Sequence, residues 1–271
     1  MNASPALEKP LTDFQYNQPT FAIDDVAGMT QAIHDDGFAL IPGVLNPEEI
    51  QDLRDAIDRL QPFGFDNGGA QAHYKCVFNR ERLFLSYIDR PGVVDLAESL
   101  MGKECHIIGQ TAWHSEPGKK GWAPHTDRIF VEMPEDMAMD PRFQLPVYLC
   151  TAHYYLNDIT LDLAPTYVIP GSHKSGRALH GENDPEWQGR KMEPVLCKAG
   201  DVLFFRSEVW HSGSANTSDE ARYLLQVHYS HRFVAQQFSP YLTWQFNPEI
   251  VSVANPRQRR LLGEHRPGAY D

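Results

Sequence analysis

The spacing of apolar residues changes at Gly102, and this change limits the folds that the chain can adopt. Before Gly102, apolar residues recur at helical spacing in three segments, residues 25–36, 46–60 and 92–101. After Gly102 the chain has short apolar or alternating runs separated by segments rich in Pro, Gly, Asn and Asp: residues 105–113, 147–156, 166–169, 202–205 and 223–229. Helices followed by short strands predict a mainly β fold, an antiparallel jelly roll braced by N-terminal helices.

Capping residues mark the predicted boundaries in the N-terminal part. Asn46 is a good N-cap, Pro47 suits the first helical position, and Glu49 stands where a capping box needs it. Gly37 ends the first helix, and the apolar residues 38–41 predict a short buried strand. A strand is therefore expected between the first two helices.

The chain has no segment that resembles a linker, so we expect residues 1–271 to form a single domain. Residues 1–20 are polar and contain three prolines, which predicts a loose N-terminal arm. The remaining divisions are a mostly helical support over residues 21–102, a jelly-roll core over residues 103–235 and a C-terminal extension over residues 236–271.

The net charge and the spacing of the cysteines limit the kinds of molecule that the protein is expected to bind and the compartment in which it is expected to work. With 24 Lys+Arg against 36 Asp+Glu, the net charge is −12, which weighs against binding to nucleic acid. No apolar run has the length of a membrane-spanning helix, and the N-terminus lacks a signal-peptide pattern. The four cysteines lie far apart and predict reduced, buried thiols. We expect a cytoplasmic protein that acts on a small molecule, without nucleic-acid or membrane partners.

The twelve histidines suggest a metal site. The pattern His-x-Asp/Glu puts two ligands on one face of a strand, and it occurs at His34-Asp36, His114-Glu116, His125-Asp127 and His180-Glu182. Context favours His125-Asp127, because it precedes residues 128–131, which we expect to start a strand. The alternative for this pair is an ion pair at the surface.

His211 and Arg222 form a second group of candidates. His211 lies in a turn of small residues, and Arg222 opens the next apolar strand. His211 can complete a ligand set of two histidines and one carboxylate, and an arginine nearby can bind the far carboxylate of a dicarboxylic cosubstrate. The alternatives are a histidine of the core and a surface ion pair.

Together these motifs resemble the phytanoyl-CoA dioxygenase family. The resemblance covers about residues 30–235 and rests on the ordered set His125-Thr-Asp127, Ile169-Pro-Gly-Ser-His173, Gly200-Asp201, His211 and Arg222. The family consists of iron(II)- and 2-oxoglutarate-dependent oxygenases on a double-stranded β-helix. It implies that His125, Asp127 and His211 bind Fe(II), that Arg222 binds the C5 carboxylate of 2-oxoglutarate, and that O2 is consumed, with ascorbate as a reductant.

Residues 110–118 also resemble the strand and turn before the iron motif of ectoine hydroxylase. The likeness implies that Gln110 faces the substrate and that His114, which replaces an asparagine, faces 2-oxoglutarate. Both are then expected to point into the barrel. Further candidates for substrate binding are Arg128, Trp122 and Tyr154, although aromatic residues of this kind often belong to the core.

The resemblance therefore predicts an Fe(II)- and 2-oxoglutarate-dependent dioxygenase that hydroxylates or desaturates a small molecule and releases succinate and CO2. Relatives that halogenate lack the carboxylate that this chain retains at Asp127. Two alternatives remain open: a catalytically silent jelly roll that binds a ligand or metal, and a cupin-type dioxygenase without 2-oxoglutarate. Arg222 weighs against the second alternative.

Overall fold

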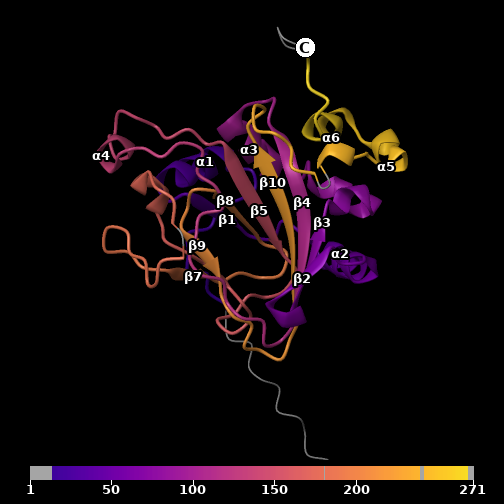
Figure 1. Cartoon of the computed structure of the whole chain (residues 1–271), viewed down its shortest axis with the longest axis horizontal. Helices are drawn as coiled ribbons and strands as arrows, with labels where there is room; N and C mark the ends of the chain where they lie inside the picture. Colours follow the sequence, from indigo (N-terminus) through magenta and orange to yellow (C-terminus); the bar gives the residue numbers. More distant parts are fainter. Residues whose placement is uncertain (1–13, 180, 239–240, 268–271) are drawn as a thin grey trace, which may run out of the picture.

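The chain folds around a large antiparallel sheet. The computed structural model describes residues 14–179, 181–238 and 241–267. Within them the strands are β1 (Phe38–Ile41), β2 (Gly64–Asp66), β3 (Gln71–Lys75), β4 (His106–Ser115), β5 (Leu149–Tyr155), β6 (Thr166–Val168), β7 (Glu193–Val195), β8 (Val202–Arg206), β9 (His211–Gly213) and β10 (Arg222–Ser230). The larger sheet has the order β1-β8-β5-β10-β4-β3-β2, and the smaller one the order β7-β6-β9 (Figure 1).

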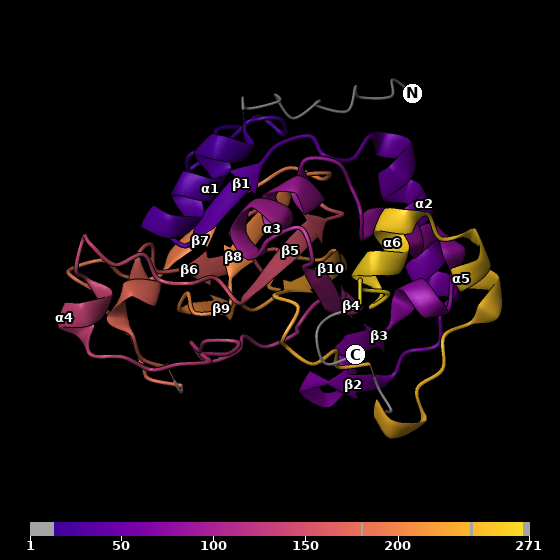
Figure 2. The ribbon, with the colours of Figure 1, turned by 90° about the horizontal axis from the view of Figure 1, so that it is seen from above.

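Helices brace the larger sheet. The α-helices are α1 (Val26–Asp35), α2 (Pro47–Arg59), α3 (Val93–Met101), α4 (Glu135–Ala138), α5 (Pro248–Val253) and α6 (Pro256–Leu261). Short 3-10 helices are η1 (Asn67–Gly69), η2 (Val77–Asn79), η3 (Arg82–Tyr87), η4 (Ser172–Ser175) and η5 (Tyr241–Thr243). Figures 1 and 2 show α2, α5 and α6 on one side of the larger sheet, and the smaller sheet with α4 on the other.

The three predicted helices are confirmed, and their caps explain where they begin. Asn46 accepts a hydrogen bond from the Glu49 backbone N–H, and the Glu49 side chain accepts one from the Asn46 N–H, both at 2.9 Å. After α1 the chain turns at Gly37, where φ is +88° and an added Cβ would lie 2.2 Å from the Val209 side chain. Glycine is therefore required between α1 and β1.

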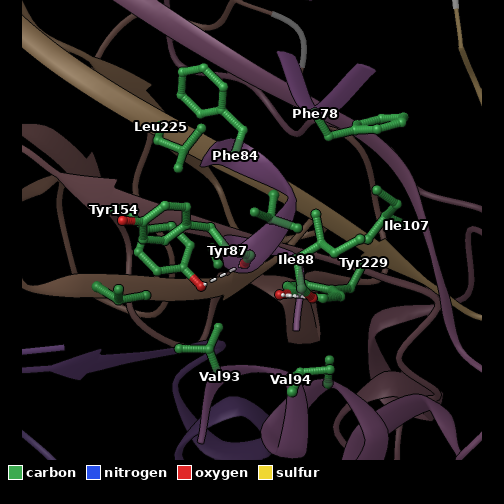
Figure 3. Close-up of a cluster of buried hydrophobic side chains, with 14 of the residues drawn as sticks. Phe78, Phe84, Tyr87, Ile88, Val93, Val94, Ile107, Tyr154, Leu225 and Tyr229 are labelled. Atoms are coloured by element: carbon green, nitrogen blue, oxygen red, sulfur yellow. Dashed lines mark hydrogen bonds between the residues drawn. The ribbon is translucent and has the colours of Figure 1, made fainter. Parts of the chain in front are cut away.

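Alternate residues of the long strands point to opposite faces of the larger sheet. One set packs against the helices in the main core, where Tyr154 and Leu225 lie near Phe84 and Tyr87 (Figure 3). The apolar members of the other set, such as Leu224, face the smaller sheet. Two facing sheets with helices on the outer face confirm the predicted mainly β fold, a double-stranded β-helix braced by helices.

Some elements differ from the prediction. Several elements are short or carry polar side chains, so their apolar pattern was too weak to predict them. They are the strands β2, β3, β7 and β9 and the helices α5 and α6. The expected strand over residues 128–131 is wrong. The backbone N–H groups of Asp127 and Arg128 donate to Ser207 O, so the chain leaves the sheet after a single bridge between His125 and His211.

The first described residues are attached to the rest of the molecule. Asn17 donates to Pro194 O at 2.6 Å and accepts from Leu196 N at 3.0 Å, and Thr20 forms a bridge with Leu40. Residues 14–20 thus differ from the loose arm expected there, and residues 1–13 lie outside the described residues. The other proposed divisions of the chain stay predictions.

The four cysteines form no disulfide in the described part of the chain, and all four are buried, as expected. Among the described residues, no helix combines the length and the apolar character that crossing a membrane requires.

Candidate metal and cosubstrate site

His125, Asp127 and His211 come together beside β9. One potential ligand atom from each lies within 4.8 Å of the others. Two backbone hydrogen bonds of 2.9 Å join His125 and His211 in both directions, so the segment before Asp127 is fixed against β9. Two imidazoles and one carboxylate on one side of an ion form the facial ligand set of non-haem iron(II) oxygenases.

The orientation of both imidazoles suits metal binding. Nδ1 of His125 lies 2.8 Å from Ala123 O, and Nδ1 of His211 lies 2.9 Å from Val209 O. Because a carbonyl can only accept, each Nδ1 is the donor of its hydrogen bond, and Nε2 is the ring nitrogen left to bind a metal. The Nε2 atoms lie 3.8 Å and 3.4 Å from Asp127 Oδ1. The three residues therefore fit an iron ion.

The electrostatic environment keeps Asp127 ionised. Burial acts to raise the pKa of its carboxyl group, but the neighbouring His211 imidazole outweighs burial and holds that pKa below its usual range. Burial lowers the pKa of His125, and the charge of His211 lowers it further. Asp127 is thus an anionic carboxylate next to the neutral imidazole of His125.

The three residues line a cavity of about 470 Å³. Its other lining residues come from β3, β4, β5, β6, β8, β9 and β10 and the segments between them: Gln71, His73, Thr111, Trp113, Lys119, Trp122, His153, Thr166, Phe205, Gly213, Arg222, Leu224, Gln226 and His228. A cavity with convergent polar groups beside a metal-binding triad is the site where small ligands would bind.

Arg222 lies in the same cavity at the start of β10. Its side chain is 6% exposed, and its guanidinium carbon lies 5.4 Å from the ring centre of Tyr155. Its Nε has no hydrogen-bond partner, and no carboxylate of the described residues forms an ion pair with it. Burial lowers the pKa of this guanidinium. A buried cation without an anion is costly, so the site is suited to a carboxylate ligand.

Polar side chains of β4 and β10 form a connected wall of this cavity. Gln226 Oε1 accepts from Thr111 at 2.8 Å and from the Trp113 indole at 2.7 Å, and Gln226 Nε2 lies 2.6 Å from His153 Nε2. His228 lies within 3.2 Å of Thr111 Oγ1. These contacts fix the wall before any ligand binds.

A second cavity of about 290 Å³ shares Thr111, Asp127 and His228 with the first. Arg128 and Gln110 line this cavity as well. Arg128 donates to the side-chain oxygen of Gln237 at 2.9 Å. The Asp127 carboxylate thus lies between two cavities, each of which contains an arginine.

The expected orientation of Gln110 and His114 is wrong. They do share a face of β4, but this face is turned toward the helices. Gln110 donates to Phe84 O at 2.9 Å, and His114 stacks on Tyr223 with ring centres 4.3 Å apart. The neighbouring residues Thr111 and Trp113 face the cavity.

Tyr154 is also turned away from the cavity. Its hydroxyl donates to Tyr87 O at 3.2 Å within the main core, as Figure 3 shows. The next residue, Tyr155, lies on the opposite face. Trp122 does line the cavity, and its indole N–H donates to Gln71 Oε1 at 3.2 Å.

Two of the remaining His-x-Asp/Glu pairs, His34-Asp36 and His114-Glu116, lie outside the metal-binding group, and the third cannot be placed. His34 lies at the end of α1, His114 lies 3.5 Å from the exposed Glu116, and His180 lies outside the described residues. The sequence reasoning missed Lys119, Thr111, Gln226 and His228. The polar residues that alternate with apolar ones on β4 and β10 were the signal for the last three.

Solved structures share this fold. The non-haem α-ketoglutarate-dependent epimerase SnoN from nogalamycin biosynthesis is 22% identical, with a TM-score of 0.60 over 76% of this chain and 83% of that one. HygX from Streptomyces hygroscopicus, solved with nickel and 2-oxoglutarate, is 16% identical, with a TM-score of 0.64 over 77% and 88%. The architecture is that of the double-stranded β-helix of non-haem iron, 2-oxoglutarate-dependent enzymes.

Sequence comparison gives the family. The model of the phytanoyl-CoA dioxygenase (PhyH) family matches residues 33–223. Dioxygenase af480 of Aspergillus fumigatus is 27% identical over 83% of this chain and 73% of its own length, and dioxygenase andF of Emericella variicolor is 30% identical over 57% and 50%. The chain belongs to the phytanoyl-CoA dioxygenase family and is an Fe(II)- and 2-oxoglutarate-dependent oxygenase that uses O2.

Proposed function

We propose that this protein hydroxylates or desaturates a small molecule, with His125, Asp127 and His211 as the iron ligands and Arg222 as the partner of the C5 carboxylate of 2-oxoglutarate. One observation supports this assignment above all. The three possible ligand atoms lie within 4.8 Å of one another in the same cavity as a buried arginine that has no carboxylate partner among the described residues.

Each residue has a distinct task in this proposal. The neutral Nε2 atoms and the Asp127 carboxylate hold the metal on one side and leave its other side open to ligands. Arg222 orients the cosubstrate by pairing with its far carboxylate. Bound iron and 2-oxoglutarate supply the chemistry, in which O2 oxidises a C–H bond and 2-oxoglutarate leaves as succinate and CO2.

The substrate would approach from the second cavity or the mouth of the first. Trp122, which is 46% exposed, offers an apolar surface at the first cavity. Arg128 offers a cation at the second cavity. This combination favours a small substrate that has both an apolar and an anionic or polar part. We place the enzyme in the cytoplasm because its four cysteines are buried and form no disulfide among the described residues.

Release of succinate tests the proposal. The purified protein, loaded with Fe(II), is incubated with 2-oxoglutarate, ascorbate and a library of small molecules under air. We expect succinate to form slowly without a substrate and faster with a fitting one. No iron binding would favour a silent jelly roll, and oxygen uptake without succinate would favour a cupin-type dioxygenase.

A further inference from the structure

Lys119 is a buried cation that the assignment above does not use. Its side chain is 2% exposed, although the residue lies in the turn that follows β4. Its Nζ donates to Ser214 O at 2.9 Å, and no carboxylate of the described residues forms an ion pair with it. A lysine that is this deeply buried normally has an anionic partner.

The surrounding backbone holds Lys119 at the cavity. Gly118 N donates to Asn216 O and Asn216 N donates to Lys119 O, both at 2.9 Å, so the turn is paired with the segment after β9. A Cβ added to Gly213 would lie 3.6 Å from Nζ, in ordinary contact. The ammonium group therefore lies beside the part of the cavity wall formed by Gly213.

Lys119 and Arg222 line the same cavity. Burial, together with the charge of Arg222, lowers the pKa of Lys119 to about 8. Two cations that repel each other in a buried site lack the anion that would neutralise both. A carboxylate between them would accept hydrogen bonds from the ammonium and the guanidinium groups.

We propose that Lys119 is a second cosubstrate-binding residue, which together with Arg222 binds the far carboxylate of 2-oxoglutarate and makes the cavity selective for dicarboxylic 2-oxo acids. This inference rests on the proposed function, because it assumes that the metal-binding triad and Arg222 receive 2-oxoglutarate. It adds Lys119 to the residues of that site and predicts that the site prefers 2-oxo acids with a second carboxylate.

The test measures binding without turnover. The visible absorption band of the anaerobic Fe(II) complex is titrated with 2-oxoglutarate and with 2-oxobutyrate, which has the same chelating end but no far carboxylate. The parent protein is compared with Lys119→Met and with Lys120→Met, a matched control at the exposed neighbouring lysine.

For Lys119→Met we expect 2-oxoglutarate to bind about 10- to 100-fold more weakly, the range for losing a charge-assisted hydrogen bond in a buried site. Binding of 2-oxobutyrate should change less than about twofold, and Lys120→Met should match the parent. Unchanged affinity for 2-oxoglutarate would overturn the inference. So would an equal loss for both acids, since Lys119 would then act on the fold or the chelating end.

A pH series gives a second readout. In the parent, affinity for 2-oxoglutarate should fall as pH rises above about 8, because Lys119 loses its proton, and in Lys119→Met it should stay flat. The other titratable or charged groups that line the cavity are His73, His125, Asp127, His153, His211, Arg222 and His228. All of them remain in Lys119→Met, so their effect is common to both proteins. A parent without any absorption band would overturn the proposed function itself and this inference with it.

Discussion

Arginine or lysine side chains are buried or half-buried both in the helical layer and in the cavity, but the two cations of the cavity have no carboxylate partner among the described residues. Glu98 of α3 accepts from Arg257 at 2.9 Å and from Arg260 at 2.6 Å, which ties α6 to α3. Arg222 and Lys119 in the cavity have no carboxylate partner among the described residues. Charge in the helical layer therefore serves the fold, whereas the two cavity cations would be neutralised by an anionic ligand under the proposals above.

The largest expected effect is loss of the metal. Asp127→Ala removes the anionic ligand between His125 and His211, and two neutral imidazoles hold Fe(II) far less tightly. We expect little bound iron by elemental analysis and no succinate release. His34→Ala is the control, because His34 lies on α1 outside the triad, and it should keep its iron. Full iron occupancy in Asp127→Ala would rule out this triad as the metal site.

Replacing Arg222 tests whether a cation of the cavity binds the cosubstrate and does not stabilise the fold. Arg222→Met should weaken 2-oxoglutarate binding by about 2–4 kcal/mol, since one partner of a desolvated charge pair is lost. Iron content should stay at the parent level, and the free energy of unfolding should not fall, because no internal ion pair is broken. An unchanged titration midpoint would show that the cosubstrate carboxylate binds elsewhere.

Replacing Glu98 tests the helical layer. Glu98→Gln should lower the free energy of unfolding by about 1–3 kcal/mol, the range for hydrogen bonds to charged groups, and leave affinity for 2-oxoglutarate unchanged. Urea unfolding at neutral pH measures the first effect. A change in cosubstrate affinity at unchanged stability would contradict the distinction between the two regions.

The ionisation of Glu98 also makes the free energy of unfolding depend on pH. Burial acts to raise the pKa of Glu98, but its bonds to Arg257 outweigh burial and lower that pKa. A depressed folded-state pKa contributes stability above the ordinary glutamate value of about 4.3, and the contribution is lost as pH falls through the folded-state pKa. The difference in stability between parent and Glu98→Gln should therefore shrink below about pH 4.

The smallest effect is expected at His114. Because its ring stacks on Tyr223 and is turned away from the cavity, His114→Asn should leave 2-oxoglutarate affinity within about twofold at every pH. Loss of the stacked pair should cost about 0.5–1.5 kcal/mol of stability. A tenfold change in affinity would show that this face of β4 reaches the cosubstrate.

Local signals in the sequence were sufficient for the helices. Asn46 and Glu49 form the predicted capping box because a cap depends on residues three positions apart. The pattern His125-x-Asp127 was informative for a similar reason: two candidate ligands two positions apart need only a short extended segment to share a face.

The orientation of β4 could not be derived in this way. Polar side chains occur on both of its faces, with Gln110 and His114 toward the helices and Thr111 and Trp113 toward the cavity. If the alternation of the strand is shifted by one residue, the side chains that face the helices and those that face the cavity exchange places. The sequence of the strand itself does not decide between these two orientations. Neighbouring Tyr154 and Tyr155 pose the same difficulty.

Lys119 was missed because its burial depends on distant residues. In the sequence it follows Pro117-Gly118, a turn in which lysine is usually exposed. Only the pairing of this turn with Asn216 and Ser214 brings the ammonium group to the cavity.

The pairing of β1 with β8 has a consequence for biosynthesis. Phe38 lies opposite Phe205 and Ile41 opposite Val202, so β1, the first strand of the described residues, is synthesised long before the strand with which it pairs. Contacts between such distant segments form slowly, because a long loop must close first. Until then the apolar residues of β1 lack their neighbouring strand, and nascent chains that end before β8 are the forms most prone to aggregate.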